Sequence, residues 1–305
     1  MPPPQDNPPR KFAGLSPNVV WMGVVSFLND LSSDMILPFI PIFLTESLGA
    51  SRAFVGLMEG IADATASLLK VISGRLSDIM RRRKPFIVLG YSLSAISKPF
   101  LAVATFPWHV LGVRFMDRVG KGTREAPRDA LISFSTDRAN FGRAFGFHRA
   151  MDTAGAAIGP LVAAAVLPFI HQDYRTLFLL SFVASFCAVL ILIIFVREVR
   201  PDGGSSAAVQ PSPDVLAAPP TRRAGARDLG FPFFLFLGVA TIAALGRASD
   251  QFLILKARDT GIVLVLIPII YFLMNTAHAL LSIPAGALAD RIGKRNMFTL
   301  GLVVF

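Results

Sequence analysis

The sequence has little charge and almost no cysteine. The first shortage argues against a soluble protein, and the second excludes a disulfide framework. Charged residues make up only 16% of the chain, whereas a soluble domain carries roughly 25%. The single cysteine, Cys187, lies in an apolar run, so no disulfide can form within the chain, and the thiol is a poor candidate for a nucleophile. The composition therefore argues against a soluble protein, and no disulfide framework can stabilise the fold.

Signatures of enzymes and metal sites are also missing. The stretch GKGT, at residues 120–123, has no Gly-x-x-x-x-Gly-Lys frame and is not a phosphate-binding loop. The four histidines, His109, His148, His171 and His278, do not show the spacing of metal ligands. We therefore expect no enzyme, no cofactor and no metal site.

Long apolar segments are what the sequence does contain. Hydrophobic residues make up 53% of the chain, and 26 of them are Phe. A membrane-spanning helix needs about 20 mostly apolar residues. Segments of this kind lie near 19–44, 53–73, 85–105, 107–127, 143–169, 174–196, 231–254 and 262–285, and a ninth begins near 297. The sequence therefore predicts an all-α membrane protein.

Two regions lack such segments. The first 17 residues are rich in proline and polar, and we expect a disordered tail there. Residues 197–230 are rich in Pro, Ala, Gly and Ser, which is typical of a flexible linker. The predicted domains are the tail at 1–17, a six-helix bundle at 18–196, the linker at 197–230 and a partial second bundle at 231–305.

The positions of lysine and arginine predict the orientation in the membrane. Loops after odd-numbered segments hold four of them, Arg52, Arg175, Lys256 and Arg258. The N-terminal tail and the loops after even-numbered segments hold 17: Arg10, Lys11, Arg75, Arg81, Arg82, Arg83, Lys84, Arg138, Arg143, Arg197, Arg200, Arg222, Arg223, Arg227, Arg291, Lys294 and Arg295. Because cytoplasmic loops carry the excess of cations, we expect the N-terminus and the linker to lie in the cytoplasm. The membrane that the chain crosses would be the cell (inner) membrane. This placement explains the net charge of +10 without a nucleic-acid partner.

A charged motif occurs twice. It reads GRLSDIMRRRK at residues 74–84 and GALADRIGKRN at residues 286–296, so both copies follow Gly-x-Leu-small-Asp and then carry a basic cluster. Each copy ends an even-numbered segment, so segments one to three correspond to segments seven to nine. Parallel repeats of this kind place a substrate site at the interface of the two halves.

The motif resembles the loop motif of the major facilitator superfamily, Gly-x-Leu-Ala-Asp-Arg-x-Gly-Arg-Lys. The second copy matches almost throughout, whereas Ile79 and Arg81 replace the arginine and the glycine in the first copy. In that family the aspartate and its cations help to lock one conformation of the alternating-access cycle. The resemblance implies this role for Gly74, Asp78, Arg82, Gly286, Asp290, Arg291 and Gly293.

Two more stretches strengthen the resemblance. Arg118 and Gly122 fit the family's fourth-span motif, and residues 155–160 resemble Gly-x-x-x-Gly-Pro of its antiporters. Glycines four apart also let two helices pack closely, so packing alone would explain the second stretch. The pattern Gly-Lys-Gly-x-Arg-x-x-Pro-Arg-Asp is similar to that of a poorly characterised bacterial subgroup and names no substrate.

The resemblance covers about residues 18–305 and implies two parallel bundles with twelve helices. About nine of the twelve can be identified here, since the sequence ends inside the ninth segment. We expect either a fragment or a truncated reading frame, and a nine-span chain is not expected to transport by itself.

Ionisable residues inside predicted membrane segments are costly and are usually paired or functional. The candidates for the substrate and proton pathway are Asp30, Asp34, Glu59, Asp63, Arg114, Arg118, Asp152 and His278. The four carboxyls of the first two segments are candidate proton carriers, or else they form static pairs with Arg114, Lys70 or Lys98. The two arginines either pair with Asp30, Asp34 or Asp152, or bind an anionic or zwitterionic group. Lys121, Arg124 and Arg128 are expected to anchor the membrane interface.

We therefore expect a secondary active transporter of a small solute, working by alternating access, with proton antiport and efflux as the preferred mode. Its partners would be an anionic or zwitterionic small-molecule substrate, protons and the lipid bilayer. The alternative is a non-transporting membrane sensor or lipid-binding protein on the same scaffold. A coding sequence that continues past Phe305 with three more spans would favour transport.

Overall fold

The computed structural model describes residues 15–136, 140–199, 234–235, 237–239, 241, 250–263, 266–277 and 299–301. The chain divides into two compact units, one formed by Met1–Ala207 and Gln251–His278 and the other by Ala208–Asp250 and Ala279–Phe305. Nearly all described residues belong to the first unit. The predicted linker lies mostly outside the described residues, so the division of the chain there stays a prediction.

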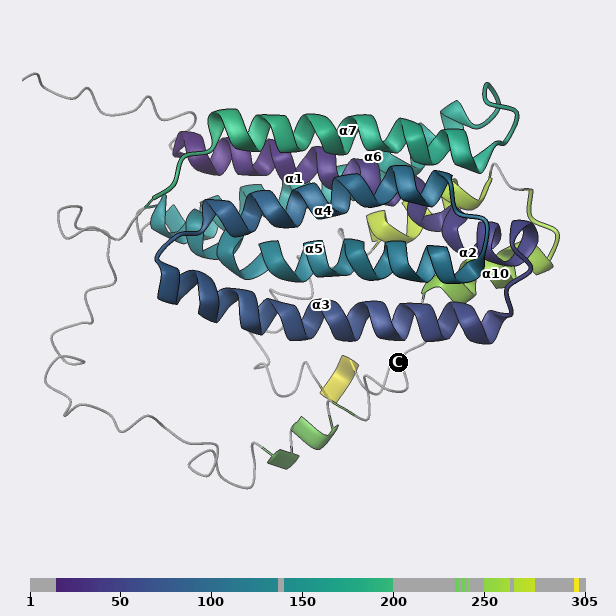
Figure 1. Cartoon of the computed structure of the whole chain (residues 1–305), viewed down its shortest axis with the longest axis horizontal. Helices are drawn as coiled ribbons and strands as arrows, with labels where there is room; N and C mark the ends of the chain where they lie inside the picture. Colours follow the sequence, from purple (N-terminus) through teal and green to yellow (C-terminus); the bar gives the residue numbers. More distant parts are fainter. Residues whose placement is uncertain are drawn as a thin grey trace, which may run out of the picture. The chain divides into compact units, whose positions relative to one another are not determined.

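Six long helical segments account for most of the first unit. The described residues form no β-strand, which confirms the all-α fold class. Figure 1 shows the long helices running alongside one another. The helices are α1 (Pro17–Ile36), α3 (Arg52–Met80), α4 (Lys84–Ala102), α5 (Pro107–Phe134), α6 (Phe141–Val166) and α7 (Tyr174–Phe195). Each coincides with one of the first six predicted segments.

Proline changes the end of the first segment, as its sequence predicts. After α1 the chain passes through η1 (Leu37–Phe39), α2 (Ile40–Ile42) and η2 (Phe43–Ser47), which are 3₁₀, α and π turns. Pro38 and Pro41 lie in these turns, and a proline has no N–H for the regular i to i−4 hydrogen bond. The helix therefore switches type but continues to Ser47.

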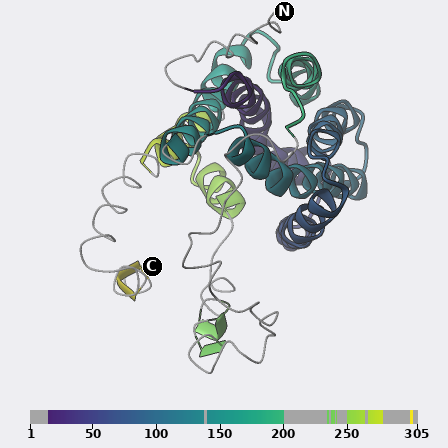
Figure 2. The same cartoon turned by 90° about the vertical axis from the view of Figure 1, so that its left-hand side faces the viewer.

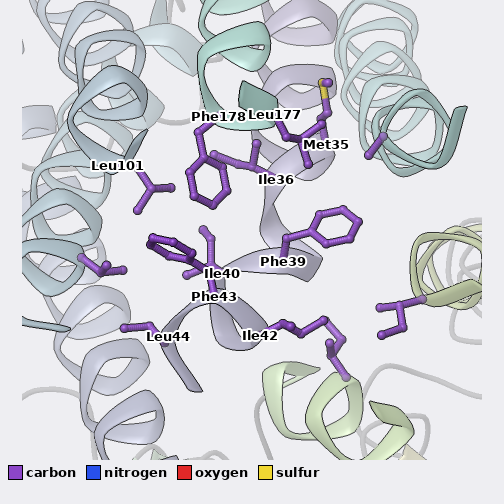
Figure 3. Packing of buried hydrophobic residues seen from close by; sticks show 14 of the residues in the cluster. Met35, Ile36, Phe39, Ile40, Ile42, Phe43, Leu44, Leu101, Leu177 and Phe178 are labelled. Carbon is purple, nitrogen blue, oxygen red and sulfur yellow. The ribbon is translucent and has the colours of Figure 1, made fainter. Parts of the chain in front are cut away.

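The side chains of the turn region fill one of two apolar cores. Figure 3 shows Phe39, Phe43 and Phe178 gathered where α1 gives way to the short turns. The rings of Phe43 and Phe178 meet edge to face, with centroids 5.4 Å apart. The second core lies around Met22, Tyr91 and other residues of α1, α4, α5 and α7. Together the two cores hold both ends of the helix bundle.

The order of helix contacts is α6–α1–α7–α4–α5–α3, and Figure 2 shows the same helices end-on. Two of these contacts depend on glycine. A Cβ on Gly90 of α4 would lie 2.5 Å from the Gly120 carbonyl oxygen of α5, and a Cβ on Gly120 would lie 2.5 Å from the Gly90 oxygen. On α6, a Cβ on Gly159 would lie 2.5 Å from the Leu31 carbonyl oxygen of α1. The Gly-x-x-x-Gly-Pro stretch therefore does bring two helices into close contact.

The outer faces of the helices are apolar. Leu68 and Val71 of α3 and Ile194 of α7 are 67%, 74% and 67% exposed. By length and composition, three described segments are long and apolar enough to cross a membrane: Pro17–Ser47, Lys84–Ala102 and Tyr174–Phe195. The helices α3 and α5 carry several ionisable side chains, and those side chains form the site described below.

The helix at the end of the seventh predicted segment runs a few residues beyond it. It was expected to end near residue 254, but α10 (Asp250–Asp259) continues to Asp259, and an apolar helix follows at Ile267–Ala277. The charges that suggested a loop are paired instead: Arg258 Nε lies 2.7 Å from Glu46 Oε1, and Arg52 Nη2 lies 2.6 Å from Asp259 Oδ1. Asp250 begins α10, and Lys256 and Arg258 lie in its last turn. This arrangement of charges is favourable for a helix, because it complements the helix dipole.

Candidate functional site

A buried ion pair lies between α3 and α5. Arg114 Nη2 donates to both carboxylate oxygens of Glu59, at 2.9 and 3.2 Å. The two side chains are only 7% and 9% exposed. A hydrogen bond between a guanidinium and a carboxylate is charge-assisted and therefore stronger than one between neutral groups. Among the alternatives from the sequence, pairing of Arg114 with Asp30, Asp34 or Asp152 is not found, because the guanidinium points at α3. The alternative in which a carboxyl of the second segment pairs with Arg114 is confirmed for Glu59.

Further charges extend this pair into a cluster. Arg118 Nη2 lies 3.9 Å from Glu59, and Arg118 Nε lies 3.9 Å from Asp63. Arg114 Nη1 also lies 3.6 Å from Asp117, one turn further along α5. Glu59 is thus shared by two guanidinium groups, and Asp63, with 74% of its side chain exposed, lies at the rim. We call Glu59, Asp63, Arg114, Asp117 and Arg118 the α3–α5 cluster.

The carboxylates of α1 have a different environment. Asp30 accepts a hydrogen bond from Asn29 Nδ2 at 3.0 Å, and Asp34 Oδ1 accepts one from the Tyr271 hydroxyl at 3.3 Å. Within the part of the chain that the structure describes, neither carboxylate has a cationic atom within 4.0 Å. Both are therefore held by neutral donors, and Asp34 joins α1 to the helix at Ile267–Ala277.

Asp152 of α6 belongs to a third group. Its Oδ2 lies 3.6 Å from His148 Nδ1, one turn away, and 4.0 Å from Arg128 Nη1 of α5. Arg128 also donates to Ser26 Oγ of α1 at 3.4 Å. Both His148 and Asp152 are buried. This group links α1, α5 and α6 at a point where the sequence offered only isolated ionisable residues.

Lysines were possible static partners for the acidic residues, and the structure places them elsewhere. Lys98 Nζ donates to Ser32 Oγ of α1 at 2.6 Å and to Ser185 Oγ of α7. Lys70 Nζ pairs with Glu125 Oε2 of α5 at 3.0 Å. Neither lysine neutralises a carboxylate of the first two predicted segments among the described contacts. Static pairing of those carboxyls is therefore confined to the two arginines of the α3–α5 cluster.

The residues of α5 that were predicted to anchor the membrane interface differ in their exposure. The Lys121 side chain is 43% exposed, as expected for an anchor. Arg124 is only 5% exposed, since its Nη1 donates to Ser94 Oγ at 2.5 Å and its guanidinium lies 4.5 Å from the Tyr91 ring centroid. The anchoring prediction is therefore wrong for Arg124, because the close approach of α4 and α5 at Gly90 and Gly120 encloses it.

The first copy of the repeated motif forms the end of α3 and the start of α4. Asp78 Oδ1 accepts a hydrogen bond from Arg83 Nη2 at 3.3 Å, while Arg82 is exposed and has no carboxylate within ion-pair distance among the described residues. Arg81, which replaces the glycine of the family pattern, has a φ of 50° and so adopts the left-handed conformation. Glycine adopts this conformation without strain, so the departure in the sequence marks a strained residue and not a different turn.

Glu198 makes a contact that the sequence gave no reason to expect. Its carboxylate accepts the backbone N–H groups of Arg83, at 3.0 Å from each oxygen, and of Lys84, at 2.8 Å. The first N–H groups of a helix have no partner within the helix, and a carboxylate placed there satisfies them. The C-terminal end of α7 is thereby joined to the start of α4. In the sequence Glu198 only follows the end of an apolar segment, and its partner Arg83 lies 115 residues away.

Five predicted residues lie outside the described part of the chain: His278, Gly286, Asp290, Arg291 and Gly293. Their roles stay predictions. Gly74 is described, and a Cβ there would lie 3.1 Å from the Ala126 Cβ of α5. In the described part of the chain, no group of three or more His, Cys, Asp or Glu side chains could hold a metal ion.

Comparisons with known proteins agree with this architecture. The family model of the Major Facilitator Superfamily matches residues 22–305. An uncharacterised MFS-type transporter of Methanocaldococcus jannaschii is 35% identical over 297 residues, which are 95% of this chain and 71% of that protein. The multidrug resistance protein MdtH of Photorhabdus laumondii is 31% identical over 138 residues, which are 45% of this chain and 34% of that protein.

A solved structure shows the same fold. The inward-facing, unoccupied bacterial homolog of the human lysosomal transporter Spinster superposes with a TM-score of 0.69 at 18% identity. The match covers 91% of this chain and 63% of that one. The chain thus spans less than two thirds of the length of this structural neighbour.

Proposed function

Because the chain belongs to the Major Facilitator Superfamily, whose members are integral membrane transporters and not enzymes, we propose that it carries a small solute across the membrane in exchange for protons. Export is the preferred direction, and the MdtH relative, a multidrug resistance protein, agrees with it. The predicted orientation, with the N-terminus in the cytoplasm of a cell membrane, belongs to the same proposal.

The observation that carries the proposal is the contrast between the two sets of acidic residues. Glu59 is committed to Arg114 at 2.9 Å and is shared with Arg118. Asp30 and Asp34 are held by an amide and a phenol instead. A carboxylate without a cationic partner is free to exchange a proton for a polar group of a solute. The α1 carboxylates are therefore the exchanging groups, and the α3–α5 cluster balances the charge.

The substrate class follows from the same charges. Arg114 Nε and Arg118 Nε are buried without a hydrogen-bond partner among the described residues. An anionic group of a solute could take these donors, since guanidinium groups bind carboxylate and phosphate well. A zwitterion would place its cationic group near Asp30 and Asp34. A small anionic or zwitterionic solute is thus the substrate that we propose.

Alternating access requires that exchange at Asp34 be coupled to movement. The hydrogen bond from Tyr271 joins Asp34 to a helix of the second half of the sequence. Protonation of Asp34 removes the negative charge that favours this contact and so alters the link. Asp78 with Arg83, and by resemblance Asp290 with its cations, would then lock one of the two states.

The test uses the complete protein in proteoliposomes that contain a pH-sensitive dye. Addition of a transported solute from a panel of anionic and zwitterionic compounds should change the internal pH, and Asp34→Asn should abolish the change. Asp173→Asn is the matched control, since Asp173 lies at the start of α7, away from the α1 carboxylates, and is mostly exposed. A full response in Asp34→Asn would overturn the proposed coupling. No response to any compound in the wild type would favour the non-transporting sensor.

A further inference from the structure

An open groove is lined by residues of α4, of α7 and of the segments next to them, and it shares no residue with the α3–α5 cluster. Its volume is about 810 Å³, within the range of roughly 300–1,000 Å³ that is usual for small-ligand sites. Val88 and Leu89 line it on α4, Ile193 lines it on α7, and Arg82, Lys84 and Glu198 stand at one end. The groove therefore has an apolar body and a charged mouth.

The apolar body faces outward. Leu89 is 52% exposed and Ile193 is 48% exposed. On α4 the lining residues Lys84, Val88 and Ser92 are four apart, so they share one helical face. In a protein that crosses the bilayer, such a face contacts lipid acyl chains and not water. The body of the groove is thus suited to a hydrocarbon chain.

The charged mouth carries more cations than it can neutralise itself. Lys84 Nζ donates to the Ile193 carbonyl oxygen at 2.8 Å, which holds the ammonium between α4 and α7. The carboxylate of Glu198 is occupied by the backbone N–H groups of Arg83 and Lys84. Arg82 is exposed, and neither its guanidinium nor the Lys84 ammonium forms an ion pair with a carboxylate among the described residues. Two cations at the end of an apolar groove are therefore available to an anion.

We propose that this groove binds one anionic phospholipid. An acyl chain lies along Val88, Leu89 and Ile193, and the lipid phosphate contacts Arg82 and Lys84. Basic pockets between membrane helices are suited to anionic head groups, and the phosphate would accept charge-assisted hydrogen bonds from both side chains. A free phosphate would leave the apolar body unused, and a lipid with a zwitterionic head group would bring a further cation to a mouth that already has an excess.

This site is independent of the transport proposal. It requires only that the chain span the bilayer, which family membership establishes. The lipid would also contact the loop that follows Asp78, next to the Asp78–Arg83 ion pair. Anionic lipid would thereby hold the junction between α3 and α4 in the arrangement described here.

The experiment measures lipid binding to the full chain in detergent by native mass spectrometry. Dioleoylphosphatidylglycerol and dioleoylphosphatidylcholine are compared because they share their acyl chains and differ in net charge. We expect the wild type to retain several-fold more of the anionic lipid. The double variant Arg82→Gln/Lys84→Gln should bind it on the order of 30-fold more weakly, at about a factor of five per cation. Arg75→Gln/Arg143→Gln removes the same charge from two exposed arginines elsewhere and should bind normally.

Further variants and a competition experiment test the apolar body and the cationic mouth of the groove separately. Leu89→Trp fills the apolar body and should lower anionic-lipid binding, whereas inorganic phosphate at millimolar concentration should not displace the lipid. Arg82→Gln alone removes an exposed side chain without an ion pair and covers the case in which the double variant fails to fold. Equal retention of the two lipids by the wild type would overturn the proposal. So would unchanged binding in Arg82→Gln and Leu89→Trp, or full displacement by phosphate.

Discussion

Glu59 of α3 and Arg114 of α5 form an ion pair in which one guanidinium nitrogen, Nη2, donates to both carboxylate oxygens and both side chains are almost fully enclosed. The two residues are 55 apart in sequence, and their contact brings Asp63, Asp117 and Arg118 into one cluster. An enclosed charge depends on its partner much more than an exposed one does. Loss of either side chain should therefore be felt in the fold as well as in transport.

We expect Glu59→Gln to destabilise the protein by roughly 3 kcal/mol, since it leaves the Arg114 charge enclosed with only Asp117 nearby. The double variant Glu59→Gln/Arg114→Gln should be less destabilised than the sum of the two single variants, because neither residue then leaves the charge of the other unpaired. Denaturant unfolding in detergent measures all three. Strictly additive losses would show that the two residues do not interact in the folded protein.

Gly159 should tolerate no side chain. A Cβ there would lie 2.5 Å from the Leu31 carbonyl oxygen and 2.8 Å from the Met35 nitrogen, and backbone atoms cannot move aside cheaply. We expect Gly159→Ala to cost about 1–3 kcal/mol by separating α6 from α1. Gly146, on the same helix, has nothing within 4 Å of its Cβ position. Gly146→Ala should therefore be neutral or stabilising by up to about 1 kcal/mol, and equal thermal unfolding midpoints of the two variants would contradict the observed packing.

Arg81 offers a stabilising substitution. Its φ of 50° is a conformation that glycine adopts freely and other residues adopt at a cost. Arg81→Gly should raise the free energy of unfolding by about 1 kcal/mol. The neighbouring Arg82 has no positive φ, so Arg82→Gly should lower the stability instead, through the greater entropy of the unfolded chain. A lower melting temperature for Arg81→Gly than for the wild type would argue against the left-handed turn.

Asp173, before the start of α7, should make stability depend on pH. The hydrogen bond from the Thr176 hydroxyl, together with the backbone N–H groups of Arg175 and Thr176, lowers the pKa of this carboxyl. A group with a depressed folded-state pKa stabilises the protein above its unfolded value of about 3.9, and the contribution is lost as the pH falls through the folded value.

Removal of this cap by Asp173→Ala should cost about 1 kcal/mol at pH 7. The difference between the wild type and Asp173→Ala should shrink as the pH falls from about 5 to 3. Asp173→Asn keeps a capping oxygen without a titrating group, so its own capping contribution should be constant over this range. Thermal unfolding of the three proteins between pH 7 and pH 3 provides the comparison. A gap between wild type and Asp173→Ala that widens toward low pH would contradict the direction of the shift.

Three of the long helical segments, Pro17–Ser47, Lys84–Ala102 and Tyr174–Phe195, are long and apolar enough to be predicted from composition alone, because the backbone of a membrane segment must satisfy its own hydrogen bonds. The helices α3, α5 and α6 carry ionisable residues inside their predicted segments. The limits were less secure where charge occurs at a helix end. Residues 255–259 look like a loop in sequence, yet they are helical because Glu46 and Arg52 pair with their charges. Such partners come from a segment more than 200 residues away and cannot be found by inspection of a local window.

The same distinction holds for the predicted site residues: the sequence identifies the residues, but not their contacts across helices. The sequence identified Glu59, Arg114 and Asp34 as unusual, since charge is costly within an apolar segment. It left the partner of Arg114 open among several carboxyls, Glu59 among them, because that choice depends on how α3 and α5 are rotated about their axes. The neutral donors of Asp30 and Asp34, and the carboxylate of Glu198 at the start of α4, depend in the same way on contacts between helices.

By itself, the sequence determined that this chain is a helical membrane protein with a duplicated charged motif, because hydrocarbon length and the cost of charge act on each segment separately. Only the tertiary structure decided which charges neutralise one another, which carboxylates stay without a cation, and where a groove meets two free cations. Those properties depend on how pairs of helices pack, and the separation of two residues along the chain does not determine whether their side chains meet.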